Sequence, residues 1–227
     1  MRFFLKVIVS IFLFVSIADA QQLTREQKLQ KIDELNSQIK LLENDVISPD
    51  VKDLRQAQKE GFNVVRIMPR ERYDHKLTVR GGGSYYSFTT GSHDYGRIAQ
   101  VGLEQNNLKV GFAGADYGFI ADLGEIPLSD VTEETAEVSF LINYKPPTNE
   151  PDVRIEQRKA DRYEANGLTY KTYMPAVVAH SYILRAISFG SADVLVAFKV
   201  HRKDADGSLI IFWKMIKIFE KPLLARG

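Results

Sequence analysis

The spacing of apolar residues along the chain changes after residue 61. Between Leu23 and Ile47 apolar residues recur three and four positions apart, which predicts a helix with one apolar face. From Phe62 onward the dominant spacing is two, which is typical of strands with one buried face. The pattern therefore predicts a mostly β, α+β overall protein in which a helical arm (residues 21–60) precedes an antiparallel β-sandwich (residues 61–227).

The first predicted helix has an apolar seam, and Thr24 and Gln27 match a capping box at its start. The seam consists of Ile32, Leu35, Ile39, Leu42 and Val46. This is the a and d pattern of a coiled coil, extended over about two heptads. Two interpretations are open: the helix packs against its own domain, or the protein forms a homo-oligomer through Ile32, Leu35, Ile39 and Leu42.

A second, shorter helix is expected directly after the first. Ser48 is its predicted N-cap, Pro49 occupies the first helical position, and Gly61 is placed for a left-handed C-cap. Val51, Leu54 and Ala57 lie on one face of this predicted helix.

Short segments with period-two alternation follow, separated by turn sequences such as Asp206-Gly207. Almost no helical pattern is expected after Gly61, and the charged stretch Glu150–Glu164 is interpreted as a solvated edge strand and loop. The predicted strands are Phe62–Met68, Lys76–Arg80, Ser84–Thr90, Arg97–Glu104, Leu108–Phe112, Phe119–Leu123, Glu137–Tyr144, Val153–Arg158, Leu168–Tyr173, Ser181–Phe189, Val194–Arg202 and Ser208–Phe219.

An internal similarity links two nine-residue segments, Asp94–Gly102 and Asp116–Gly124, which are identical at six positions. No third copy follows, so a solenoid of stacked repeats is not predicted. We expect two similar turn-plus-strand units that lie side by side in one sheet.

Residues 1–20 have the three parts of a secretory signal peptide. Arg2 and Lys6 supply the positive start, Val7–Ile17 the apolar centre, and Ala18-Asp19-Ala20 the small-x-small cleavage pattern. We therefore expect an exported protein, periplasmic or extracellular, with no membrane span after signal removal. The sequence contains no cysteine, which favours a bacterial envelope protein because small exported eukaryotic domains commonly contain disulfides.

Charge and composition narrow the classes of partner. The 30 Lys and Arg side chains are balanced by 29 Asp and Glu side chains, so the chain lacks the basic excess of nucleic-acid-binding proteins. Without cysteine it also lacks thiolate metal sites, and the spacing of its four histidines matches no metal-binding motif. We expect no cofactor, no nucleic acid, and a glycan or another envelope protein as partner.

The candidate ligand-binding residues concentrate between Gly81 and Gly124, where glycines, tyrosines and carboxylates alternate. Tyrosine rings offer flat faces with a polar edge, and carboxylates accept hydrogen bonds from hydroxyl groups, which suits a carbohydrate or a peptide. The alternative is that these aromatic residues fill the core of the sandwich. The candidates are Tyr85, Tyr86, His93, Asp94, Tyr95, Arg97, Asp116 and Tyr117.

Motifs of known catalytic mechanics are missing from the sequence: it contains no GxSxG, no P-loop and no HExxH. The favoured hypothesis is an exported, non-catalytic binding or interaction protein of the bacterial cell envelope. One alternative is an envelope glycan hydrolase with Asp94 and Asp116 as its carboxylate pair. The other is a structural protein that oligomerises through the N-terminal helix.

Overall fold

The computed structural model describes residues 23–96 and 98–225. The predicted signal peptide, residues 1–20, lies outside this part of the chain, and so does Arg97. Among the described residues, no helix combines the length and the apolar character that crossing a membrane requires. The chain divides into two structural units, one up to Ile39 and the other from Lys40 onward.

The first helix, α1 (Arg25–Ile47), begins at the predicted capping box. The Thr24 backbone N donates to Gln27 Oε1 at 2.8 Å, and the Gln27 backbone N donates to Thr24 Oγ1 at 3.2 Å. All five residues of the predicted seam are exposed on this helix.

The second helix, α2 (Val51–Glu60), ends at Gly61, whose φ of 79° confirms the predicted left-handed C-cap. Its N-cap is Asp50 rather than Ser48, so the predicted start is wrong by two residues. Pro49 therefore precedes the cap instead of occupying the first helical position.

The three apolar residues Val51, Leu54 and Ala57 of α2 are not buried together. Asp53 and Ala57 are buried, whereas Val51 and Leu54 are exposed. The reason is an ion pair: Asp53 Oδ2 lies 2.5 Å from Arg202 Nη2, so a charged side chain occupies the inward face. A paired and hydrogen-bonded carboxylate can be buried in this way, which an apolar pattern does not reveal.

The described strands form antiparallel sheets, which confirms the predicted sandwich-like α+β fold. The larger sheet has the order β1 (Asn63–Ile67), β11 (Leu209–Ile218), β10 (Ala192–Lys203), β9 (Ser181–Ser188), β5 (Tyr117–Gly124). The smaller sheet has the order β2 (Tyr85–Tyr86), β3 (Val101–Glu104), β4 (Asn107–Lys109), β8 (Tyr173–Pro175). A separate pair consists of β6 (Tyr163–Ala165) and β7 (Leu168–Tyr170).

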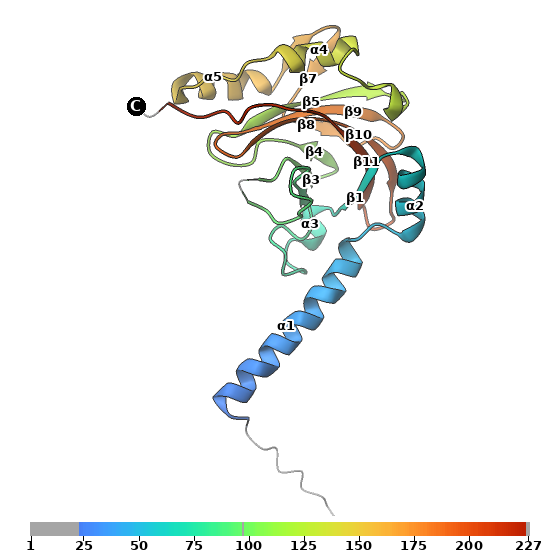
Figure 1. Cartoon of the computed structure of the whole chain (residues 1–227), viewed down its shortest axis with the longest axis vertical. Helices are drawn as coiled ribbons and strands as arrows, with labels where there is room; N and C mark the ends of the chain where they lie inside the picture. Colours follow the sequence, from blue (N-terminus) through green and yellow to red (C-terminus); the bar gives the residue numbers. More distant parts are fainter. Residues whose placement is uncertain (1–22, 97, 226–227) are drawn as a thin grey trace, which may run out of the picture. The chain divides into compact units, whose positions relative to one another are not determined.

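Both faces of the five-stranded sheet are covered, which explains why its strands are apolar on both sides (Figure 1). In β10, Val196 and Phe198 belong to the core shared with the smaller sheet, while Leu195 and Ala197 belong to the core shared with the helices. The helices that contribute buried residues to the second core are α2, α4 (Ala136–Asn143) and α5 (Glu150–Ala160). Two shorter helical turns are α3 (Arg70–Tyr73) and η1 (Leu128–Asp130).

Two predicted strands, Glu137–Tyr144 and Val153–Arg158, are helices in the structure. In α4 the buried side chains are Val138 and Leu141, three residues apart, so its apolar residues fit a helical face as well as an alternating strand. The stretch Glu150–Glu164, interpreted as an edge strand and loop, contains α5 instead. The Asn149 side chain caps α5 by accepting from the Asp152 backbone N at 3.0 Å.

The expectation from the internal similarity is wrong as well. Tyr117–Gly124 is strand β5 of the five-stranded sheet, but residues 95–96 and 98–100 lie outside the strands and only residues 101–102 enter β3 of the smaller sheet. The predicted strand Lys76–Arg80 is a run of turns and bends. These local patterns were outweighed by the packing around them, as is usual for strand propensity.

Candidate functional site

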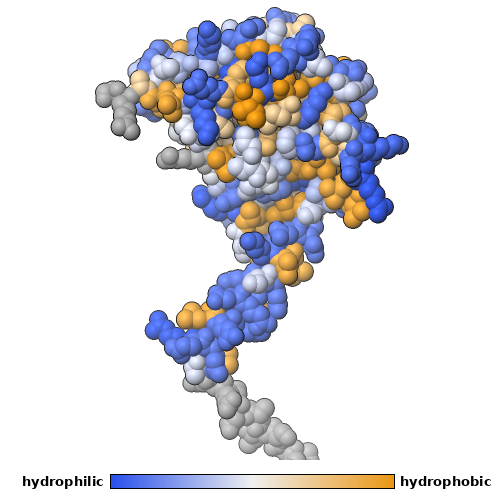
Figure 2. All heavy atoms as spheres, viewed as in Figure 1, coloured by the Kyte–Doolittle hydropathy of each residue, from blue (hydrophilic) through white to orange (hydrophobic). Residues whose placement is uncertain are grey.

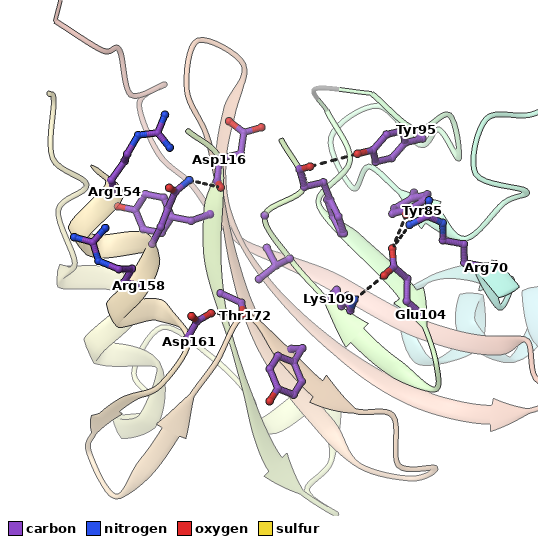
Figure 3. A pocket seen from close by; sticks show the side chains of 16 residues that line it. Arg70, Tyr85, Tyr95, Glu104, Lys109, Asp116, Arg154, Arg158, Asp161 and Thr172 are labelled. Atoms are coloured by element: carbon purple, nitrogen blue, oxygen red, sulfur yellow. Dashed lines mark hydrogen bonds and ion pairs between the residues drawn. The ribbon is translucent and has the colours of Figure 1, made fainter. Parts of the chain in front are cut away.

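A cleft of about 590 Å³ opens between the smaller sheet and α5. Figure 3 shows Tyr85, Tyr95 and Arg70 on one side and the arginines of α5 on the other. The cleft is also lined by Tyr117, the first residue of β5, and by Asp116, which directly precedes it. Four of the predicted ligand-binding residues, Tyr85, Tyr95, Asp116 and Tyr117, therefore line the same cleft.

The first wall is aromatic. The ring centroids of Tyr85 and Tyr95 are 4.5 Å apart, and those of Tyr85 and Phe112 are 5.1 Å apart. The Tyr95 hydroxyl donates to the Phe112 carbonyl oxygen at 3.3 Å. Gly102 makes this cluster possible, because a Cβ there would lie 2.9 Å from Tyr85 Cδ1. Tyr85 is buried beneath the wall, whereas Tyr95 and Phe112 are half-buried and keep part of their rings accessible.

Glu104 anchors this wall electrostatically. Its carboxylate accepts from the Tyr85 hydroxyl at 2.6 Å, from Arg70 Nη1 at 2.8 Å and from Lys109 Nζ at 2.6 Å. Burial by itself would raise the pKa of Glu104, but the bonds from Lys109, Tyr85 and Arg70 outweigh it and lower the pKa to about 2. Glu104 is thus an ionised acceptor with its partners in place. Burial and the bond to Glu104 raise the pKa of Tyr85, so its hydroxyl stays protonated.

The second wall is basic and is supplied by α5. Arg154 pairs with Glu150 at 2.6 Å, but both side chains are mostly exposed, so the pair leaves the guanidinium available. The Arg158 side chain is exposed and makes no hydrogen bond or ion pair with residues 23–96 or 98–225. Gln157 holds the helix in place: its Nε2 donates to the carbonyl oxygens of Gly114 at 3.0 Å and Asp116 at 3.2 Å.

Asp116 and Tyr117 are engaged in the framework of the cleft. Asp116 Oδ1 accepts from the Phe189 backbone N at 3.1 Å, which connects the start of β5 to the end of β9. Tyr117 is buried, and its hydroxyl lies 2.7 Å from the hydroxyl of Tyr144, which donates to Glu156 at 2.8 Å. Burial raises the pKa of Tyr117, so its hydroxyl stays protonated. Tyr117 therefore belongs both to the core and to the floor of the cleft.

Three other predicted residues, Tyr86, His93 and Asp94, do not line this cleft. Tyr86 is buried against Phe88 in the core between the sheets, with ring centroids 5.4 Å apart, as the alternative interpretation of the aromatic residues holds. His93 Nε2 bonds the Arg66 carbonyl oxygen at 2.7 Å, and burial lowers the pKa of His93. Asp94 is exposed elsewhere, so the cleft does not contain Asp94 and Asp116 as a carboxylate pair.

The sequence analysis missed the basic residues of the cleft, Arg70, Lys109, Arg154 and Arg158. The two arginines of α5 were overlooked because their segment was interpreted as a strand. The Asn149 cap, Pro151 in the first turn and basic residues in the last turn are the signals that could have identified this helix. Within the described parts of the chain, no group of three or more His, Asp or Glu side chains is arranged to hold a metal ion.

Comparisons with known proteins add nothing to the geometry of the cleft. The chain matches no protein-family model, no curated protein and no solved structure. The chemistry of the cleft therefore has to be derived from its own residues.

Proposed function

We propose that this chain is an exported, non-catalytic binding protein of the bacterial cell envelope, and that its cleft binds a carbohydrate that carries carboxylate groups. The observation that supports this proposal most directly is the pairing of two walls: accessible aromatic rings face two exposed arginines of α5, Arg154 and Arg158 (Figure 3).

The aromatic wall suits the flat face of a sugar ring. Tyr95 and Phe112 are held by their contacts with Tyr85 and are still partly accessible, so stacking on them requires little reordering. Tyr173, which also lines the cleft, is 48% exposed and offers a second aromatic face.

The basic wall suits a carboxylate. Four basic side chains line the cleft, but Arg70 and Lys109 are bound to Glu104. Arg154 and Arg158 remain for a ligand, and a guanidinium recognises a carboxylate through two parallel hydrogen bonds. A neutral sugar would offer no opposite charge to Arg158, whose side chain has no ion pair within the described residues, or to Arg154, whose pair with Glu150 is exposed.

The carboxylates of the cleft favour binding over hydrolysis. A general acid needs a raised pKa, whereas the pKa of Glu104 is lowered to about 2. Asp161 accepts from Thr172 Oγ1 at 3.2 Å, and Asp116 is bonded to the Phe189 backbone. Each of these carboxylates has a structural partner instead of an open position beside a scissile bond.

Titration calorimetry tests the proposal on the exported protein, purified after expression of the full chain. An oligogalacturonate should bind, and a neutral galacto-oligosaccharide of equal length should bind at least about tenfold more weakly, which corresponds to about 1.4 kcal/mol. Binding should weaken with added salt, because a charged pair at an open cleft is screened.

Variants separate the two walls. Tyr95→Ala should weaken both sugars, whereas Arg158→Ala should weaken only the acidic one. Arg162→Ala is the matched control, since Arg162 is an exposed arginine that pairs with Glu164 and does not line the cleft. If a Glu-rich peptide binds and neither sugar does, the ligand is an acidic peptide and the proposed carbohydrate ligand is wrong. If the protein releases shortened sugars, it is a hydrolase and the proposed non-catalytic function is wrong.

A further inference from the structure

A continuous apolar stripe runs along α1 without being buried. Ile32, Leu35 and Ile39 are 51%, 45% and 41% exposed, and Leu42 and Val46 are 67% and 43% exposed. Figure 2 shows apolar residues at the surface of this helix among polar ones. A contiguous apolar surface of this kind marks an interaction site in a water-exposed protein. The spacing of three and four residues is the seam of a two-stranded coiled coil, with isoleucine at a and leucine at d.

We propose that this stripe binds the same stripe of a second copy of the chain, and that the two α1 helices run antiparallel. In that orientation an a residue faces a d residue of the other copy. Ile32 then lies opposite Leu42 of the second copy, and Leu35 lies opposite Ile39 of the second copy. By symmetry each of these layers occurs twice, so all four residues are covered.

Two positively charged residues at the N-terminal end of the seam argue against a parallel pair of helices in register. Arg25 and Lys28 occupy the a and d positions before Ile32. A parallel pair would place Arg25 against Arg25 and Lys28 against Lys28 at the centre of the interface, where like charges repel. In the antiparallel pair Lys28 lies opposite Val46 of the second copy. There its charge is close to the negative end of the partner's helix dipole.

The residues beside the seam are complementary only in the antiparallel pair. The g positions are Lys31, Gln38 and Asp45, and antiparallel helices bring g against g. Lys31 therefore faces Asp45 of the second copy on both sides of the symmetry axis. In a parallel pair g faces e, where Lys31 would meet Asn36 and no opposite charge.

Both charged groups are free to make this contact. The Asp45 side chain is exposed and makes no hydrogen bond or ion pair with any residue in the described ranges. Lys31 pairs with Glu34 at 2.8 Å, but both side chains are about half exposed, so this pair competes weakly. On the other flank, position e opposite Leu29 of the second copy is Glu43, which is buried and whose carboxylate accepts from Thr78 Oγ1 at 2.6 Å, so it presents no free charge there.

Sedimentation equilibrium on the exported protein, purified after expression of the full chain, measures the association. The apparent molecular mass should rise from that of one copy to that of two copies as the protein concentration increases. Lys31→Asp and Asp45→Lys should each weaken dimerisation several-fold, because each creates two like-charge contacts. The double exchange should restore it. Gln30→Lys is the matched control, because Gln30 lies at position f on the opposite face.

Cysteine cross-linking tests the orientation separately, and the chain has no native cysteine to interfere. A mixture of Leu35→Cys and Ile39→Cys proteins should form the mixed disulfide, because these positions face each other. A disulfide formed by Ile39→Cys alone would show parallel helices and overturn the orientation. A single-copy mass at every concentration would overturn the proposal as a whole.

Discussion

Arg185 and Asp193 form a buried two-point ion pair between the neighbouring strands β9 and β10. The Arg185 Nε and Nη2 atoms donate to the two carboxylate oxygens of Asp193 at 2.8 and 2.7 Å, and the side chains are 2% and 1% exposed. Arg185 Nη1 also donates to the carbonyl oxygens of Leu141 and Tyr144, the latter at 2.7 Å. One guanidinium therefore connects the large sheet to the end of α4, where helical carbonyls have no partner within the helix.

Removing one member of this pair should be costly. Asp193→Ala leaves a buried guanidinium without its counter-charge, and we expect the free energy of unfolding to fall by about 3–5 kcal/mol. Urea denaturation followed by circular dichroism measures the loss. Glu150→Ala breaks the exposed pair with Arg154 and should cost less than about 1 kcal/mol. Equal costs for the two variants would show that the buried pair is not a principal connection in the fold.

The stability of the protein should depend on Glu104 in acid. A carboxyl whose pKa is lower in the folded than in the unfolded state stabilises the fold above its unfolded pKa and loses this effect as the pH falls through its folded pKa. For Glu104 this pH interval runs from its unfolded pKa of 4.5 down to its folded pKa of about 2. Across it, up to about 3 kcal/mol should be lost.

Glu104→Gln isolates this contribution. The variant should be less stable than the parent protein at neutral pH, and its stability should fall less steeply between pH 4.5 and about 2. Urea denaturation at a series of pH values measures both slopes. Asp206, whose pKa is also lowered to about 2 by Ser208 and Tyr73 against the effect of burial, remains in both proteins as an internal reference. Parallel curves for the two proteins would contradict the assignment to Glu104.

Gly118 is required for the contact between β5 and β9. A Cβ at this position would lie 2.2 Å from the Arg185 carbonyl oxygen and 2.6 Å from Val110 Cγ2. Because backbone atoms cannot move aside as a flexible side chain can, Gly118→Ala should lower the free energy of unfolding by about 3 kcal/mol or more. Gly96→Ala is the control, since nothing lies within 4 Å of its added Cβ. Thermal unfolding of both variants should give a lowered Tm for Gly118→Ala alone.

Four of the sixteen residues that line the cleft could be predicted from the sequence. Tyr85, Tyr95, Asp116 and Tyr117 stood out because aromatic, glycine and acidic residues gather in one segment, and all four line the cleft. Arg154 and Arg158 did not stand out, because their helix was not identified. The buried residues of α5 are Val153 and Ala160, and two buried positions seven residues apart give too weak a period to identify a helix.

The sequence by itself determined the elements whose apolar pattern extends over many residues. It predicted α1 with its capping box, and the successive strands Ser181–Phe189, Val194–Arg202 and Ser208–Phe219 correspond to β9, β10 and β11. Local periodicity suffices there, because the spacing of apolar residues repeats along the whole element.

Only the tertiary structure decided what lies on the second face of the sheet. The segments that became α4 and α5 are short, and burial on that face explains inward charges that no local pattern predicts, such as Asp53 beside Arg202 and Arg185 beside Asp193. The cleft exists because α5 packs beside β5, through contacts such as Gln157 with the Asp116 carbonyl, which join residues far apart in the chain. Long-range packing and ion pairing, rather than local propensity, therefore created the site.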